Sequence, residues 1–389
     1  MGNPMTRRIA ALLINLTLAV ACMHEAQVSW LGAPKAIAPG VDLFQSTDAT
    51  LVEPSAPIAV HLLRLDPDRV VVESALSNDE VMGAERVDGI AKRRNALAAV
   101  NAGFFNVKNG EPAGLLKVAG ELVSDTTLTR GAIAIHSLPG GGQRFYFDQA
   151  SAKVVARFKA DTQDATVLVD GVDTTRERGK LMLYTPAYHA DTDTAPRGTD
   201  WILEGKPLKV IDIRENLGKA AIPRAGAVLS FGGLELPSPL EWLLQGSTVT
   251  FETRWKILNG TPEEHFEQAR DVVNGAGLLI RDGVTMSDWL SKENLLPTFT
   301  DGKHPRTLIG IDRKGMVWLV AIDGRQPDYS MGMMFKDLLA LCARLDLVNA
   351  LNLDGGGSTT MVAGGALVNK PSDVTGPRPV SDALVVRAR

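Results

Sequence analysis

The sequence is poor in the features that define several classes of protein. It contains only 2 cysteines in 389 residues, so it has no disulfide framework. Histidine and cysteine nowhere fall at the spacing of a zinc site, and no run of five or more lysines and arginines appears. With a formal net charge of −4 as well, the sequence gives no support for a nucleic-acid partner.

The sequence also lacks an N-terminal apolar run long enough to span a membrane, which needs roughly 20 residues. The apolar stretch at residues 9–21 follows Arg7 and Arg8, as the h-region of a secretory signal follows its n-region. The stretch ends in Ala-Val-Ala, which fits a cleavage site. We therefore predict a signal peptide over residues 1–21 and an exported protein, periplasmic or secreted. Cys22 stands where a lipid anchor would attach, so a membrane tether through this residue stays open.

Composition divides the remaining chain into a tether and a folded part. Residues 22–57 are rich in proline, alanine and glycine and predict a linker. Residues 58–389 are predicted to form the functional domain. Within it, residues 154–255 alternate short apolar runs with turn clusters, which indicates a β-rich subdomain. Cys342 lies on the apolar face of a predicted helix and is expected to be a small buried core residue.

Two aspartates near the C-terminus each follow a short apolar run. Asp323 follows residues 316–322, Asp354 follows residues 351–353, and an amphipathic segment at 332–345 lies between them. This spacing predicts two parallel strands joined by a right-handed helical crossover. We predict an α+β fold, a mixed sheet with a C-terminal parallel βαβ unit and a β-rich middle segment. Both aspartates would lie at the sheet edge where α/β proteins bind ligands.

A glycine-rich run follows Asp354 directly. Its residues are Gly355, Gly356, Gly357, Ser358 and Thr359. Consecutive backbone N–H groups and hydroxyls of this kind can hold a phosphate or a developing oxyanion. A glycine-rich turn that needs positive φ is the alternative, but three successive glycines exceed what a tight turn requires. The run is neither a Walker loop nor a dinucleotide fingerprint.

Three arginines stand next to predicted strands and suit an anionic substrate. They are Arg306, Arg325 and Arg378. A guanidinium can grip a phosphate through two parallel hydrogen bonds. The alternative, that Arg306 and Arg325 simply pair with nearby carboxylates, stays open.

Asp323 and Asp354 are the predicted acid/base pair. Glycosyl transfer to water commonly uses two carboxylates, one donating a proton and one attacking or stabilising the anomeric carbon. A turn-capping role for one of them is the alternative. A triad of Ser358, His304 and Asp323 lacks the expected nucleophile elbow. No cofactor or metal site is predicted, although carboxylate oxygens would also suit a divalent cation.

Five ordered motifs resemble those of the phosphodiester glycosidase domain family. They are Asn101-Ala102-Gly103-Phe104-Phe105, His304-Pro305-Arg306-Thr307, Asp323-Gly324-Arg325, Asn352 to Thr359, and Arg378-Pro379-Val380-Ser381-Asp382. The resemblance covers the chain from about residue 58 to the C-terminus. Two positions depart from the family pattern: Ala102 replaces a common glycine, and Asp382 replaces a residue that is often asparagine. The second departure adds a carboxylate near the predicted site.

The resemblance implies an exported hydrolase that cleaves a sugar-1-phosphodiester, such as N-acetylglucosamine-1-phosphodiester, at its glycosidic bond. In this interpretation the glycine run, Arg306 and Arg325 hold the phosphate, and Asn101 positions sugar hydroxyls. Arg378 and Asp382 are further candidate substrate-binding residues. A role in envelope or exopolysaccharide metabolism would fit export. The alternatives are a non-catalytic envelope protein that binds anionic polysaccharide, and a phosphodiesterase or serine esterase that cuts the P–O bond.

Overall fold

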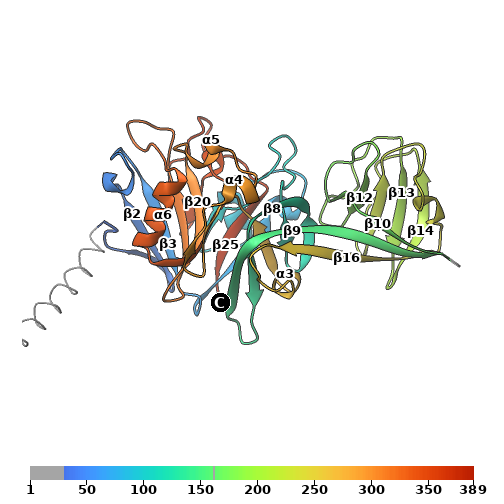
Figure 1. Cartoon of the computed structure of the whole chain (residues 1–389), viewed down its shortest axis with the longest axis horizontal. Helices are drawn as coiled ribbons and strands as arrows, with labels where there is room; N and C mark the ends of the chain where they lie inside the picture. Colours follow the sequence, from blue (N-terminus) through green and yellow to red (C-terminus); the bar gives the residue numbers. More distant parts are fainter. Residues whose placement is uncertain (1–29, 161–162) are drawn as a thin grey trace, which may run out of the picture.

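The computed structural model describes residues 30–160 and 163–389, and β-strands dominate it (Figure 1). The predicted signal peptide and Cys22 lie outside these residues. Only short helices occur in the described chain. They are α2 (Val87–Arg93), α3 (Glu264–Glu267), α4 (Trp289–Lys292), α5 (Pro297–Thr300) and α6 (Phe335–Arg344), with 3₁₀ turns at Ala49–Leu51, Ser77–Asp79, Leu240–Trp242 and Gly356–Ser358. No described helix has the length and apolarity that a membrane crossing requires.

The first sheet has 8 strands and carries the ends that form the site. In spatial order they are β1 (Lys35–Ala38), β2 (Val41–Ser46), β3 (Val60–Leu65), β21 (Val317–Ile322), β20 (Arg306–Asp312), β22 (Leu347–Asn352), β18 (Leu278–Arg281) and β19 (Val284–Thr285). The prediction of a tether is therefore wrong between Lys35 and Ser46, because β2 pairs along its length with β3. Alternating apolar residues in β2 give it a buried face, which the proline and alanine content concealed.

The predicted α+β fold with a parallel βαβ unit is wrong. The helix α6 does connect β21 to β22, but β20 lies between these strands and pairs antiparallel with both. β21 and β22 thus run in the same direction without sharing hydrogen bonds, and every pair in this sheet is antiparallel. The local pattern could not reveal this, because β20 comes earlier in the chain and is inserted by tertiary pairing. The ends of β21 and β22 still meet at one edge.

The second sheet has 5 strands and lies across the buried core from the first. Its order is β24 (Ala366–Leu367), β23 (Met361–Ala363), β5 (Ala98–Asn101), β25 (Asp382–Ala388) and β4 (Val70–Leu76). On the other face of the first sheet, Leu338, Leu341 and Cys342 of α6 are buried in a separate core cluster. The prediction that Cys342 is a buried core residue is confirmed, and burial raises the pKa of its thiol to about 12.

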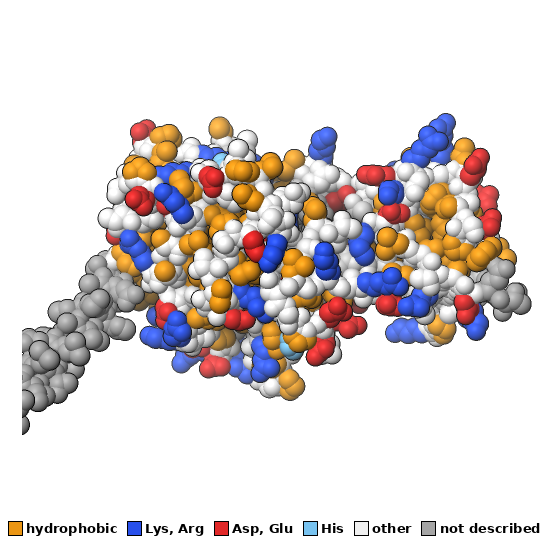
Figure 2. Space-filling model, in the orientation of Figure 1, with side chains coloured by type: hydrophobic (Ala, Val, Ile, Leu, Met, Phe, Trp, Pro, Cys, Tyr) orange, Lys and Arg blue, Asp and Glu red, His pale blue; other side chains and the backbone are white. Residues whose placement is uncertain are grey.

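The third sheet has 12 strands and extends from the body into an outer lobe (Figure 1). Its strands are β6 (Leu116–Val118), β7 (Glu121–Ser124), β8 (Thr126–Ser137), β9 (Gln143–Ala160), β10 (Gln163–Leu168), β11 (Gly171–Val172), β12 (Leu181–Tyr184), β13 (Thr199–Glu204), β14 (Leu208–Glu215), β15 (Gly226–Phe231), β16 (Thr248–Ile257) and β17 (Asp271–Asn274). The long strands β9 and β16 pair over their shared length and bridge the two parts. A hydrophobic cluster that includes Trp201 and Leu229 fills the lobe. The space-filling view shows a waist between lobe and body (Figure 2).

Candidate functional site

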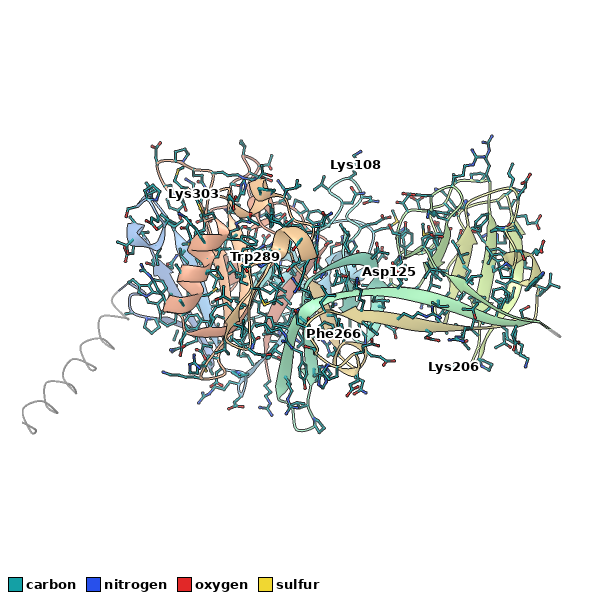
Figure 3. The ribbon with its side chains drawn as sticks, in the orientation of Figure 1. Lys108, Asp125, Lys206, Phe266, Trp289 and Lys303 are labelled. Carbon is teal, nitrogen blue, oxygen red and sulfur yellow. The ribbon has the colours of Figure 1, made fainter. Side chains whose placement is uncertain are left out.

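The candidate site lies where the strand ends of the first two sheets meet. The backbone joins them directly: Asp354 N–H donates to the Ala102 carbonyl at 3.0 Å, and Ala102 N–H donates to the Asp382 carbonyl at 3.2 Å. Asp354 follows β22, Ala102 follows β5, and Asp382 begins β25. Residues from three of the five motifs are therefore neighbours in space. In Figure 3, Lys303, which precedes His304 of the second motif, marks this side of the body.

Asn101 lies beneath the glycine run and is 0% exposed. Its side-chain Nδ2 donates to the Asp354 carbonyl at 2.7 Å, and its Oδ1 accepts from Thr307 Oγ1 at 2.8 Å and from Thr360 N–H at 3.1 Å. Thr307 Oγ1 also lies 3.4 Å from Thr359 Oγ1. These bonds fix the position of the run relative to β5 and β20. The geometry gives Asn101 a positioning role, and no contact with a sugar hydroxyl is available to its buried amide.

The glycine run is not a nest of free amides. Among its N–H groups, that of Gly355 donates to its neighbour Asp354 Oδ1, Gly356 to the Pro305 carbonyl and Ser358 to the Gly355 carbonyl. Gly357 is the residue of the run whose amide has no acceptor among the described residues. Because the glycines have no side chains, they instead leave room for neighbouring groups.

Two guanidinium groups lie against the glycines. A Cβ on Gly356 would come within 3.0 Å of Arg325 Nη2, and a Cβ on Gly357 would come within 2.1 Å of Arg378 Nη2. Gly356 also adopts φ +60°, which disfavours any side chain. Three glycines in succession thus let two positive charges approach the backbone closely. The sequence predicted both arginines but gave no reason why they needed the glycines.

Of these two arginines, Arg325 is the one whose guanidinium is exposed. It is exposed, and its guanidinium forms no hydrogen bond or ion pair with any residue that the structure describes. Its backbone has φ +58°, a conformation that costs free energy for a residue other than glycine. Arg378, in contrast, forms a two-pronged ion pair with Asp373 at 2.8 and 3.2 Å. A phosphate placed over Gly356 and Gly357 would meet Arg325 without displacing an existing partner.

Asp354 is half-buried and closely surrounded by protein atoms. The pKa of its carboxyl is raised to about 6, mainly by burial and to a smaller extent by the nearby Asp382 carboxylate. Ser358, the Gly355 amide and Arg378 lower this pKa in part. The Ser358 hydroxyl faces the carboxylate but forms no hydrogen bond of good geometry, and it has no other partner among the described residues. A carboxyl with such a pKa can exchange a proton near neutral pH.

Asp382 is fully buried, and burial raises the pKa of its carboxyl as well. It accepts hydrogen bonds from Gly103 N–H at 3.1 Å and from Ser381 Oγ at 2.5 Å. A Cβ on Gly103 would come within 3.2 Å of the same carboxylate, which shows how tightly this loop packs on it. The carboxylate that acts on Asp354 is therefore Asp382, whereas the sequence paired Asp354 with Asp323.

Asp323 has a different environment and is 1% exposed. Its Oδ2 accepts from Tyr329 Oη at 3.0 Å and lies 2.9 Å from His61 Nε2, and its Oδ1 accepts from Asn369 Nδ2 at 2.9 Å. The Lys370 backbone amide donates to both oxygens. These bonds occupy the carboxylate and anchor the loop before Lys370. The arrangement favours a positioning role for Asp323 over the predicted catalytic one.

Arg306 is similarly enclosed, at 1% exposure. Its guanidinium donates to the backbone carbonyls of Met333, Phe299 and Gly302 and lies over the rings of Phe299 and Phe335. It has no carboxylate partner among the described residues, and burial lowers its pKa to about 10. These contacts hold the loop that precedes β20, so Arg306 is placed to support the structure of the site.

Sequence reasoning missed several residues that complete the site. His61, Tyr329, Asn369 and Asp373 each bond a predicted residue, yet they lie outside the motifs. His61 comes from β3, and its side chain reaches Asp323 across the pairing of β3 with β21. Within the described residues, no group of three or more His, Cys, Asp or Glu is arranged to hold a metal ion.

Comparison with known proteins supports the family resemblance. Residues 218–387 match the family model described as phosphodiester glycosidase. The predicted family resemblance is confirmed. The matched part contains five of the candidate site residues, Asp323, Arg325, Asp354, Arg378 and Asp382.

A curated relative supports the same family. The human N-acetylglucosamine-1-phosphodiester alpha-N-acetylglucosaminidase is 34% identical over 110 residues, which are 26% of this chain and 21% of the human protein. The bovine protein of the same name is 43% identical over 68 residues, 18% of this chain and 12% of that protein. The chain thus aligns with about a fifth or less of the length of these relatives.

Two solved structures share the fold of this chain. A hypothetical protein from Synechocystis has a TM-score of 0.75 at 23% identity and covers 92% of this chain and 64% of its own. A putative exported protein from Burkholderia pseudomallei has a TM-score of 0.71 at 23% identity, covering 85% and 74%. At this identity the likeness extends to the fold alone.

Proposed function

We propose that this protein hydrolyses a sugar-1-phosphodiester, such as N-acetylglucosamine-1-phosphodiester, at the glycosidic C–O bond. The observation that carries the proposal is the half-buried Asp354, whose pKa is raised to about 6, next to a glycine run flanked by two guanidinium groups. The site thus combines a proton acceptor with a phosphate-sized positive surface. The family match supports the reaction class.

The phosphate would lie over Gly356 and Gly357. Arg325 would bind two of its oxygens, because its guanidinium is exposed and unpaired among the described residues. Arg378 would offer a further guanidinium donor beside Gly357, while Asp373 balances its charge and holds it in place. Electrostatic stabilisation of the departing phosphate would lower the barrier without protonating it, since the phosphate monoester released from C1 is already a good leaving group.

Asp354 would act on water. Above its pKa the carboxylate accepts a proton from a water molecule, whose oxygen bonds the anomeric carbon as the C–O bond to phosphate breaks. The phosphate leaves with the electron pair of that bond. Asp382 would favour the reaction by keeping the pKa of Asp354 high, which makes it a stronger base.

We also propose that the protein is exported and acts in the cell envelope. The proposal is supported by the basic and apolar residues at the N-terminus and by the similar fold of a putative exported protein. Mass analysis of the mature protein from its native cells would test it: removal of residues 1–21 is expected, and an intact N-terminus would contradict export.

Hydrolysis in oxygen-18 water tests the reaction. Purified protein is incubated with a UDP-sugar and a panel of methyl-phosphoryl sugars, and both products are analysed by mass. We expect the label in the released sugar, because water attacks carbon. Label in the phosphate would instead establish P–O cleavage. No turnover with any substrate, combined with saturable binding, would favour the non-catalytic glycan-binding alternative. D328N is a matched control, since Asp328 is exposed on the loop after Asp323.

A further inference from the structure

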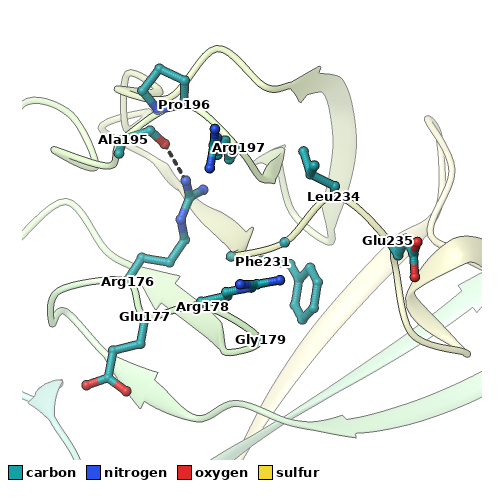
Figure 4. Close-up of a pocket in the computed structure, with 12 residues that line it drawn as sticks. Arg176, Glu177, Arg178, Gly179, Ala195, Pro196, Arg197, Phe231, Leu234 and Glu235 are labelled. Carbon is teal, nitrogen blue, oxygen red and sulfur yellow. Dashed lines mark hydrogen bonds between the residues drawn. The ribbon is translucent and has the colours of Figure 1, made fainter.

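The outer lobe contains a recess that the proposed hydrolysis does not use (Figure 4). Its volume is about 590 Å³, and three arginines line it: Arg176, Arg178 and Arg197. The first two come from the segment between β11 and β12, and the third comes from the segment between β12 and β13. The loop after β15, with Gly232 and Gly233, forms another wall. None of these residues belongs to the site in the body.

Arg176 is a fixed part of the wall. Its side chain is 5% exposed, and its Nη1 donates to Asp200 Oδ1 at 3.1 Å and to Ser230 Oγ at 2.8 Å. Its Nη2 donates to the Ala195 carbonyl, as Figure 4 shows. A Cβ on Gly198 would come within 2.7 Å of Nη1, so glycine makes room for this guanidinium. Because Asp200 balances its charge, Arg176 organises the recess and adds little net charge to it.

Arg178 and Arg197 supply the net positive charge. Both are exposed, and neither side chain forms a hydrogen bond or ion pair with a described residue. Arg197 has φ +86°, an unfavourable conformation for a residue with a side chain. In Figure 4 the Glu177 carboxylate points away from the guanidinium groups, and Glu235 lies at the far end of the recess. The two acidic residues of the lining therefore leave the arginines unneutralised.

The remaining walls suit a ligand larger than a bare ion. The ring of Phe231 lies beside Arg178 in Figure 4 and offers an apolar face. The amides of Gly233 and Leu234 donate no hydrogen bond to any described residue. A recess of this volume falls within the usual range for small-molecule sites, roughly 300 to 1,000 Å³. Apolar wall, free amides and two unpaired guanidinium groups together match a sugar that carries an oxyanion.

We propose that this recess is a second binding site, which takes a saccharide bearing a phosphate or a carboxylate. Arg178 and Arg197 bind the oxyanion, since guanidinium groups match the geometry of both anions. Phe231 contacts the C–H face of the sugar. The site binds without any chemical step, and it does not depend on the hydrolysis proposed for Asp354.

Hydrogen exchange read by mass spectrometry tests the site on the full chain. Glucose 1-phosphate and glucuronate at millimolar concentration are compared with glucose and with inorganic phosphate. We expect slower exchange at residues 176–180, 195–198 and 232–235 with at least one anionic sugar, and none with glucose. Which anionic sugar protects identifies phosphate or carboxylate as the recognised group. Peptides that cover 323–330 and 354–360 report the other site separately.

Two double variants distinguish binding in the recess from non-specific attraction of an anion to surface cations. R178Q/R197Q should abolish the protection in the lobe or weaken the apparent affinity at least about tenfold. K206Q/R224Q removes two exposed cations that do not line the recess, and it should change the affinity less than about twofold. Lys206 lies at the lower edge of the lobe in Figure 3. Equal losses in both variants, no protection with any probe, or equal protection by inorganic phosphate and anionic sugar would overturn the proposal.

Discussion

The two halves of the candidate site use the same residue types in opposite ways. In the enclosed half, Asp323 and Arg306 are each 1% exposed, and backbone or side-chain partners occupy their polar groups. In the open half, Asp354 is half-buried with a raised pKa, and Arg325 is exposed without a partner among the described residues. The comparison teaches that a charged residue at a strand end can support a site or act in it, and that its hydrogen bonds decide which.

The largest expected effect comes from D354N. Removing the proposed base should lower turnover by about 10²- to 10⁴-fold. Turnover of the substrate identified in the oxygen-18 water experiment measures the loss, and D328N should keep parental activity. Near-parental turnover by folded D354N would remove Asp354 from the chemistry and end the distinction between the halves.

Folding provides a second readout for D354N. The pKa of Asp354 in the folded protein is about 6, above the value of about 3.9 in an unfolded chain. The carboxylate therefore destabilises the fold above pH 6, and this cost disappears as the pH falls below 4. D354N should be at least as stable as the parent at pH 7.5, by urea unfolding. A large loss of stability would instead show that Asp354 supports the fold.

R306M should destabilise the enclosed half of the site. Methionine fills similar space but leaves the carbonyls of Phe299 and Gly302 without the donor that Arg306 supplies, and it removes one of the two donors to the Met333 carbonyl. We therefore expect a loss of about 3–5 kcal/mol in the free energy of unfolding. Urea unfolding measures it. R313M is the control, because Arg313 is exposed near the other end of β20. Parental stability combined with a raised KM would return Arg306 to the phosphate-binding group.

D323N should also act mainly on stability. An amide in place of the carboxylate would face the donors of Asn369, Tyr329 and the Lys370 amide with one NH₂ group, which costs about 2–4 kcal/mol. At a temperature where the variant stays folded, kcat should fall less than about tenfold. A fold of parental stability with kcat reduced 10³-fold would restore Asp323 to the predicted acid/base pair.

R325Q should raise KM with a small change in stability. Loss of one guanidinium contact to phosphate is expected to weaken binding by about tenfold, near 1.4 kcal/mol. Steady-state kinetics with a methyl-phosphoryl sugar measures the change. R313Q offers the same loss of charge away from the site. An unchanged KM would mean that the substrate does not reach Arg325.

Sequence patterns located the site but could not show which of its charged residues are enclosed and which are open. The motifs placed Asp323, Arg325 and Asp354 near one another because residues after strands collect at sheet edges, and the family resemblance added Asp382. They could not show that His61 and Asn369 bond Asp323, since these partners lie far away in the chain. The strand β20 adjoins β21 in the chain, but its pairing with β22 joins distant segments and was missed for the same reason. Periodicity reports which face of an element is buried, whereas pairing order and hydrogen-bond partners depend on tertiary contacts.

The smallest and most specific effect concerns Asp382 and the pH dependence of the open half. If Asp354 acts as a base, kcat/KM should fall as the pH decreases through about 6, because the carboxylate then gains a proton. Asp382 raises that pKa through its negative charge, while an asparagine at this position could still accept from Gly103 N–H. D382N should therefore move the acidic limb to lower pH by about 0.5 to 1 unit.

The direction of the D382N shift separates three cases. A limb that moves down identifies Asp354 as the titrating base and Asp382 as the residue that tunes it. An unmoved limb, equal to that of D328N, would mean that the titrating group does not sense Asp382. Activity that instead falls as the pH rises through 6 would mean that the protonated form of Asp354 is required. Asp354 would then donate a proton to the leaving phosphate, and Asp382 would serve to keep that proton bound.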